Sequence, residues 1–306
     1  MLGWGCVMGE EEFNGQWTLE EQTEHINVLE LKAILLSLQA IGDKIKNQHV
    51  RVSSDSTTAV TYVNKMGGIT SIKCNKLSKE IWELCIENNT WLSCQHIPGK
   101  ENAADAPSRK VNEDIEWQIS ENVFQEICNI WGTPSIDLFA SRTSHKVPLY
   151  CSWKRDPKAA FIDAFSLPWN TFELPYMFPP FSTIARCLQK LQQDQAEAIM
   201  IVPLWPQQPW FPNMLRALID HPLVLPNTTN ILYLAHSTAT HPLSPKLKLI
   251  ACRLSGVNGK TRTFQRKLST SSWNHGGQQQ GPNTRRTYQS GTAFALKGTA
   301  IPFYHL

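Results

Sequence analysis

The chain has 306 residues, of which 42% are hydrophobic and 18% are charged. This length and composition suit about two packed domains and exclude wholesale disorder. No apolar run reaches the roughly 18–20 residues of a membrane-spanning helix, so no membrane span is predicted. The eight cysteines are scattered without CxxC pairs. That pattern argues against a zinc ribbon or a disulfide scaffold and favours an intracellular protein with reduced thiols.

Charge is distributed unevenly along the chain. The formal net charge is +3, yet ten Lys and Arg residues and no Asp or Glu follow Asp220. Residues 1–220 therefore hold 19 basic and 26 acidic residues, a net charge of −7. This asymmetry predicts a mildly acidic folded body and a basic C-terminal region. That region either contacts the phosphates of a nucleic acid or is a solvated linker.

The first predicted domain, residues 1–110, alternates strands and helices. An apolar strand over residues 2–8 precedes an Asn14-Gly15 turn and a return strand from Gln16. Apolar periodicity then predicts helices over 27–40, 56–66 and 75–87, strands over 50–55 and 90–97, and a short helix from Ala103. This order of elements indicates an α/β layer architecture with a sheet flanked by helices.

The second predicted domain, residues 111–235, is a smaller α/β unit. A helical stretch surrounds Phe124, a strand covers 135–139, and a Pro-Pro turn at 178–181 separates a strand from a helix. The apolar run 198–204 predicts a buried parallel strand. Residues 236–306 are rich in Ser, Thr, Gly and Gln, so a basic, largely irregular and flexible tail is expected there.

Three acidic residues of the first domain lie where a metal site on a sheet needs them. Asp55 ends a predicted strand, Glu30 lies in the first turns of a helix, and Asp105 lies in the short helix. Such carboxylates among apolar or small neighbours are costly unless they are paired or bind a metal, and Mg²⁺ prefers oxygen ligands. The alternatives are an N-cap for Asp55 and surface positions for the other two.

Four ordered motifs carry a family resemblance: Gly3-Trp4-Gly5, and residues 25–33 (HINVLELKA), 54–60 (SDSTTAV) and 96–109 (HIPGKENAADAPSR). They resemble the ribonuclease H (RNase H) domain of retrotransposon polyproteins, and DIRS-type elements, which carry a tyrosine recombinase, fit best. The resemblance implies an RNase H-like mixed sheet and an endonuclease, a hydrolase that cleaves the RNA strand of an RNA–DNA hybrid.

The same resemblance implies the roles of individual residues. The family's metal-binding carboxylates fall on Glu30, Asp55 and Asp105, which would bind two Mg²⁺ ions and position the attacking water. His96 would lie at the edge of this site, for proton transfer or product release, unless it is a hydrogen-bonded strand-end histidine. The partners would be the hybrid itself, together with the reverse transcriptase and recombinase parts of the ancestral polyprotein.

One departure from the family bears on activity. The family places a further carboxylate on the opening strand, a few residues before Gly-Trp-Gly, and here only two residues precede Gly3. We therefore expect little or no nuclease activity from the chain as written. The alternative function is that of a catalytically inactive module that binds nucleic acid.

The second domain carries another resemblance. Residues 136–142 (IDLFASR), Asp163, residues 178–181 (FPPF) and residues 201–205 (IVPLW) follow the order of Dam-type adenine methyltransferases. This resemblance implies an S-adenosylmethionine pocket that Asp137 serves, and a place for Phe181 to stack on a base. Phe178 replaces the Asn or Asp that accepts a hydrogen bond from the target amine. A degenerate domain is therefore expected, which binds a ligand without catalysis or is only a scaffold.

Overall fold

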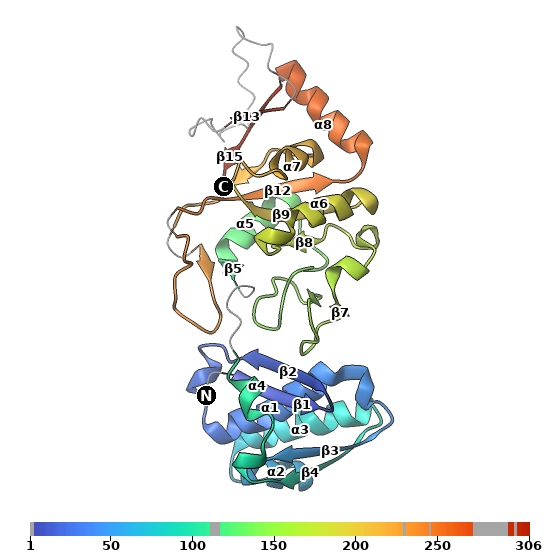
Figure 1. Cartoon of the computed structure of the whole chain (residues 1–306), viewed down its shortest axis with the longest axis vertical. Coiled ribbons are helices and arrows are strands. Elements are labelled where there is room, and N and C mark those ends of the chain that lie inside the picture. Colours follow the sequence, from blue (N-terminus) through green and yellow to red (C-terminus); the bar gives the residue numbers. More distant parts are fainter. Residues whose placement is uncertain (1–2, 111–116, 229–230, 245, 272–292, 297–298) are drawn as a thin grey trace.

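The computed structural model describes residues 3–110, 117–228, 231–244, 246–271, 293–296 and 299–306, and it is a mixed α/β structure. Figure 1 shows an N-terminal unit, mostly blue and cyan, at one end of the long axis and a second unit beyond it. No helix in the described part of the chain is long and apolar enough to cross a membrane. The eight cysteines, all of them described, are unpaired.

The N-terminal unit has the predicted alternation of strands and helices. Its elements are β1 (Gly3–Met8), β2 (Glu11–Gln16), α1 (Ile26–Ile41), β3 (His49–Ser54), α2 (Thr57–Asn64), α3 (Ile72–Glu87), β4 (Trp91–His96) and α4 (Asp105–Ser108). β1 pairs antiparallel with β2, and β3 pairs parallel with β4. Across residues 3–110, no ladder joins these two pairs, so the expected single mixed sheet is not formed.

The first hairpin turns at a different place from the predicted one. Met8 pairs with Glu11, and Gly9 between them has a φ of 62°. A two-residue hairpin turn needs this left-handed conformation, which glycine adopts without strain. Gly15 instead lies inside β2, where a Cβ atom would lie 2.6 Å from Nε1 of Trp4. The Asn-Gly pair therefore makes room for a buried tryptophan.

Close packing explains a second glycine. A Cβ atom on Gly5 would lie 2.6 Å from the Ser108 backbone nitrogen and 2.7 Å from the Ala104 oxygen. Helix α4 therefore crosses directly over the backbone of β1, an approach that only glycine permits. The Gly-Trp-Gly motif thus fixes the place of the helix that contains Asp105.

The second unit is built on a five-stranded sheet with the order β15-β10-β12-β9-β8. Its helices are α5 (Glu121–Trp131), α6 (Ile184–Gln193), α7 (Phe211–Ala217) and α8 (Asn258–Ser271). Its strands are β5 (Gln118–Ile119), β6 (Cys151–Ser152), β7 (Phe161–Ile162), β8 (Tyr176–Met177), β9 (Glu197–Pro203), β10 (Leu223–Val224), β11 (Leu232–Tyr233), β12 (Leu249–Ser255), β13 (Ala293–Leu296), β14 (Thr299–Pro302) and β15 (Tyr304–His305). β12 and β9 pair antiparallel along their whole length.

Both faces of this sheet are buried. Ala198, Met200 and Val202 of β9 pack into the core that α6, α7 and α8 cover. Ile199 and Ile201 face the other core, which α5 covers. This alternation makes a three-layer structure, and it confirms the prediction of a buried strand over 198–204. The strand pairs parallel with β8 and antiparallel with β12.

The prediction of a flexible tail over 236–306 is wrong for most of that region. β12 lies in the middle of the sheet, and Phe264 and Leu268 of α8 are buried in the core. β15 then pairs with β10 at the sheet edge. The second unit thus extends well past 235 and is larger than the predicted 111–235 domain. Residues 272–292, with Arg285 and Arg286, lie outside the described residues.

Charged hydrogen bonds join the two units. The Arg142 guanidinium donates to the Glu21 carboxylate at 2.8 and 3.0 Å, and to the Gln16 carbonyl at 2.7 Å. Lys32 also contacts Glu21, at 2.7 Å. Burial alone would raise the pKa of Glu21, but Arg142 and Lys32 outweigh it and lower this pKa to about 2. Glu21 therefore remains ionised, and the junction holds, until the pH is strongly acidic.

Gly256 gives a direct test that the C-terminal region belongs to the core. A Cβ atom there would collide with the backbone oxygen of Leu191 at the end of α6. We expect Gly256→Ala to lower the free energy of unfolding by about 1–3 kcal/mol, as overpacking does. Gly259→Ala is the matched control, because nothing lies within 4 Å of its added methyl group. Chemical denaturation of both variants provides the measurement, and equal stabilities would contradict the assignment.

Candidate functional site

Two of the predicted carboxylates interact electrostatically in the N-terminal unit. Asp55 follows the last residue of β3, and Glu30 lies on α1 and is half-buried. Burial raises the pKa of Glu30, and the negative charge of Asp55 raises it further. The two side chains therefore repel each other electrostatically at one site.

A loop holds the Asp55 side chain in place. Nδ2 of Asn102 donates to Oδ1 of Asp55 at 3.1 Å, and Oδ1 of Asn102 accepts from the Ala104 amide at 3.1 Å. The N-cap of α2 is Ser56, whose Oγ accepts from the Ala59 amide. The N-cap alternative for Asp55 is therefore wrong, and its carboxylate is free to serve another purpose.

Asp105 and His96 are placed differently from that pair. Asp105 is exposed, and its carboxylate accepts from Nη2 of Arg109 at 2.9 Å. His96 is the exposed last residue of β4, and its backbone lies beside Ser54 of β3. In the parts of the chain that are described, no three His, Cys, Asp or Glu side chains form a group that could hold a metal ion. The structure thus brings Glu30 and Asp55 together but does not bring Asp105 to them.

Two carboxylates give fewer ligands than a two-ion arrangement needs, and no described group of three His, Cys, Asp or Glu side chains completes the set. Mg²⁺ usually keeps several waters and takes one or two carboxylates together with substrate phosphates. Glu30 and Asp55 supply such a pair of oxygen ligands. Burial is the larger cause of the raised Glu30 pKa, and a cation bound beside both carboxylates would offset only the part that comes from the charge of Asp55. No second set of ligands accompanies them within the described ranges.

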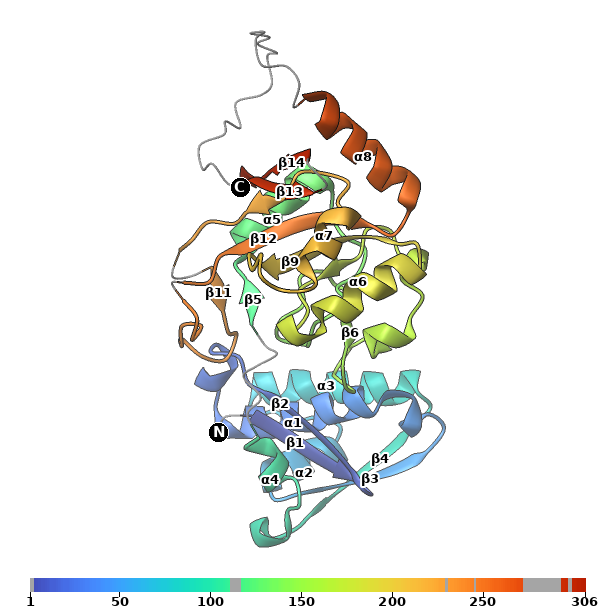
Figure 2. The ribbon, with the colours of Figure 1, turned by 45° about the horizontal axis from the view of Figure 1, so that its top comes forward.

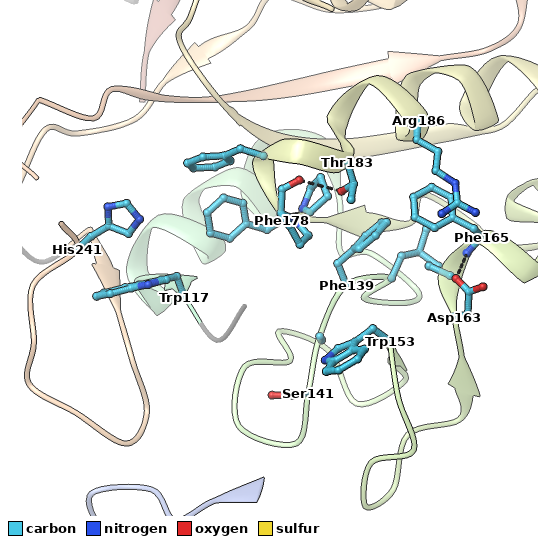
Figure 3. A pocket seen from close by; sticks show the side chains of 16 residues that line it. Trp117, Phe139, Ser141, Trp153, Asp163, Phe165, Phe178, Thr183, Arg186 and His241 are labelled. Carbon is cyan, nitrogen blue, oxygen red and sulfur yellow. Dashed lines mark hydrogen bonds between the residues drawn. The ribbon is translucent and has the colours of Figure 1, made fainter. Parts of the chain in front are cut away.

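A second candidate site is an aromatic cavity of about 330 Å³ in the second unit. Figure 3 shows side chains from several loops around it. Its aromatic and proline lining consists of Trp117, Phe139, Trp153, Phe165, Phe178, Pro179, Pro180 and Phe181. Its polar lining consists of Ser141, Asp163, Thr183, Arg186 and His241. An apolar cavity with a few polar groups is typical of a small-molecule or base-binding site.

The Pro-Pro turn shapes one wall of the cavity. It connects β8 to α6, as predicted, and the Pro180 carbonyl accepts from both the amide and the hydroxyl of Thr183 at 2.8 Å. The Phe181 ring meets the Trp205 ring edge-to-face, with centroids 5.1 Å apart. These contacts fix Phe181 in the wall, at the position from which stacking was predicted.

One end of the cavity carries opposite charges. Asp163 has a φ of 59°, unusual for a residue other than glycine, and its carboxylate accepts from the Phe165 amide at 3.0 Å. The Arg186 guanidinium lies 3.7 Å from the centre of the Phe165 ring (Figure 3). The sequence motifs contain Asp163 but gave no signal for Arg186 or Trp153, which reach the cavity from other segments.

The Asp137 side chain lies outside this cavity, so the cavity does not provide the predicted contact between Asp137 and a cofactor. Asp137 is only 2% exposed and is not part of the cavity lining. Its two carboxylate oxygens accept from the backbone amides of Phe139 and Lys146. Burial raises the pKa of Asp137 to about 7 despite these two hydrogen bonds. Asp137 therefore shapes the loop that brings Phe139 and Ser141 to the cavity.

Comparison with known proteins adds little. No protein-family model matches the chain, and no curated protein matches it. Among solved structures, ribonuclease H1 from the halophilic archaeon Halobacterium salinarum NRC-1 is 20% identical. The match covers 35% of this chain and 80% of that chain, with a TM-score of 0.29. This score is below the range that indicates a shared fold.

The buried Asp137 predicts a pH dependence of stability. Its pKa is about 7 in the folded protein, against 3.8 as the ordinary value. The folded state thus binds the proton more tightly, so stability falls as pH rises between these two values. From about pH 4 to about pH 8, we expect the stability of the wild type to fall relative to Asp137→Asn by on the order of 3 kcal/mol. Parallel urea-unfolding profiles against pH would contradict this expectation.

Proposed function

We propose that this chain is a nucleic-acid-binding protein of RNase H-like, DIRS-type retroelement origin, which binds RNA–DNA hybrids and cleaves them weakly or not at all. The observation that supports this proposal is the pairing of Glu30 with Asp55 at the end of a parallel strand. The resemblance carried by the four motifs implies metal-binding carboxylates at these two positions. If the chain derives from such a retroelement, its ancestral partners would be the reverse transcriptase and recombinase parts of the same polyprotein.

The chain's own groups would act as follows. Glu30 and Asp55 bind one Mg²⁺, which when bound supplies positive charge to a phosphate of the hybrid. Asn102 orients Asp55 through its 3.1 Å hydrogen bond, so it is a positioning residue. Asp105 pairs with Arg109 at 2.9 Å on the surface and is not counted among the ligands. Without a third carboxylate, the attacking water is poorly positioned, and we therefore expect little cleavage.

Mg²⁺ binding tests this site. At ten times its Kd, Mg²⁺ should stabilise the wild type by about 1.4 kcal/mol. Asp55→Asn should abolish that gain, because a neutral amide relieves the repulsion and is a poorer ligand. Asp43→Asn removes an exposed acid that pairs with Lys46 and is the matched control. Thermal unfolding with and without Mg²⁺ provides the measurement, and an equal gain in all three proteins would contradict the site.

The same three proteins test the expectation about cleavage. Each is incubated with Mg²⁺ and a hybrid labelled on its RNA strand. We expect no more cleavage by the wild type than by Asp55→Asn. Robust cleavage by the wild type that Asp55→Asn abolishes would show an active enzyme and would contradict the proposal of a weak or inactive site.

The aromatic cavity favours a second candidate function, binding of an unpaired base. Phe178, Phe181 and Trp153 offer aromatic faces, and base stacking tolerates any sequence because every base has a π-face. Phe178 offers no hydrogen-bond acceptor to a target amine, so the cavity suits binding without methyl transfer. S-adenosylmethionine is the competing ligand that the Dam-type resemblance implies.

Titration calorimetry separates these ligands. We expect a short single-stranded oligonucleotide to bind and S-adenosylmethionine to give no heat. Phe181→Ala should weaken oligonucleotide binding about tenfold, since stacking contributes about 1–3 kcal/mol per base. Phe172→Ala removes a partly buried ring that does not line the cavity and is the matched control. Heat from S-adenosylmethionine that Phe181→Ala abolishes would assign the cavity to the cofactor instead.

A further inference from the structure

Helix α8 carries a concentration of positive charge that neither candidate site uses. Over Asn258–Ser271 it has no acidic residue and four basic ones. All four are exposed: Lys260, Arg262, Arg266 and Lys267. Phe264 and Leu268 bury the opposite side of the helix. The helix is therefore amphipathic, with a cationic outer face.

A cleft of about 320 Å³ lies between this helix and β14. Arg262 and Arg266 line it together with Gln265, and Leu296 and Ile301 contribute apolar surface. Residues four apart on a helix lie on the same side, with Cβ atoms about 5–6 Å apart. The two guanidinium groups thus extend from one edge of a concave surface.

Negative charge is scarce around this cleft. Glu197 pairs with Lys260 and with Arg253, and no Asp or Glu follows Asp220. The strands β13, β14 and β15 therefore bring no carboxylate to the cleft. The lining of the cleft, as described, includes two arginine side chains and no Asp or Glu.

The cationic face is held in place by the fold. Phe264 packs against the His221 ring with centroids 5.2 Å apart, and Nε2 of Gln265 donates to the Arg216 carbonyl at 3.5 Å. Leu268 is 3% exposed. Because folding has already ordered the helix, an anion that binds there loses less affinity to conformational entropy than it would on a flexible tail.

We propose that the cleft between α8 and β14 binds the phosphodiester backbone of a nucleic-acid duplex, with Arg262 and Arg266 contacting neighbouring phosphates. Charge complementarity identifies the occupant, since arginine matches phosphate in geometry and charge. The choice of a nucleic acid over another polyanion rests on the proposed function. Figures 1 and 2 both place α8 at the end of the molecule away from β3, so this contact is separate from the carboxylate pair.

Salt-dependent binding tests the proposal. A short labelled RNA–DNA hybrid is titrated with the full chain in EDTA, and its fluorescence anisotropy is followed at several salt concentrations. Each phosphate contact contributes about −0.9 to the slope of log K against log salt for a duplex. We expect Arg262→Gln with Arg266→Gln to reduce the slope by about 2 and the affinity about tenfold.

Two further variants make the result decisive. Lys44→Gln with Lys46→Gln changes the net charge equally at the other unit and should leave the slope unchanged. Arg262→Lys with Arg266→Lys keeps the charge and should keep the slope. An equal loss in the Lys44/Lys46 variant, or an unchanged slope in the Arg-to-Gln variant, would overturn the proposal. Asp55→Asn should not alter this slope. The slope therefore tests the cleft alone, and a failure of the proposed Mg²⁺ site would not change it.

Discussion

The antiparallel ladder between β9 and β12 is the constraint on which the second unit depends. It pairs Glu197–Pro203 with Leu249–Ser255 and lies between β8 on one side and β10 on the other. Alternate side chains of both strands fill two separate cores. Because β12 lies inside the sheet, the C-terminal part of the chain contributes to the cores on both of its faces.

The pairing of β8 with the other side of β9 positions one wall of the aromatic cavity. β8 pairs with β9, and the Pro-Pro turn that supplies Phe178 and Phe181 begins where β8 ends. The opposite wall comes from the loop that Asp137 organises through two backbone hydrogen bonds. Burying a carboxylate costs free energy. The buried Asp137 carboxylate stabilises the conformation of this loop and does not line the cavity. The cavity thus depends on the edge of the sheet and on one buried polar residue.

The sequence predicted the elements better than their connections. Apolar periodicity located α1 and α3 to within a few residues, and the acid after β3 was correctly recognised as lying at a strand end. The moderately apolar stretch 247–254 stands out in a segment rich in Ser, Thr and Gln, but the polar composition around it favoured an irregular tail, so β12 was not predicted. The hairpin turn was misplaced because an Asn-Gly pair is a strong local signal, while the packing of Trp4 on Gly15 is a tertiary effect.

The residues of the candidate sites, too, could be predicted from the sequence only in part. Glu30 and Asp55 meet because one lies on α1 and the other follows β3, a geometry that local motifs can indicate. Asp105 belongs to a motif of the same quality, yet its exposed side chain pairs with Arg109, the residue after its short helix. Arg186 reaches the aromatic cavity from α6, and no spacing rule connects it to Asp163. Side-chain pairing therefore decides which acids form a site, and it depends on contacts that sequence patterns do not encode.

The placement of charge connects the two units to their proposed partners. Arg142 is largely buried and is fully committed to Glu21 and Gln16, so it stabilises the junction and offers nothing to a ligand. Arg262 and Arg266 stand on a helix with no acid of its own and face a cleft. A guanidinium group has the same chemistry in both places, but Arg142 is largely buried whereas Arg262 and Arg266 are exposed to solvent, where a phosphate can reach them. The positive charge beyond Asp220 that was expected on a flexible tail is thus, in part, fixed on the surface of a folded sheet, where it can act as an ordered contact for a nucleic-acid backbone.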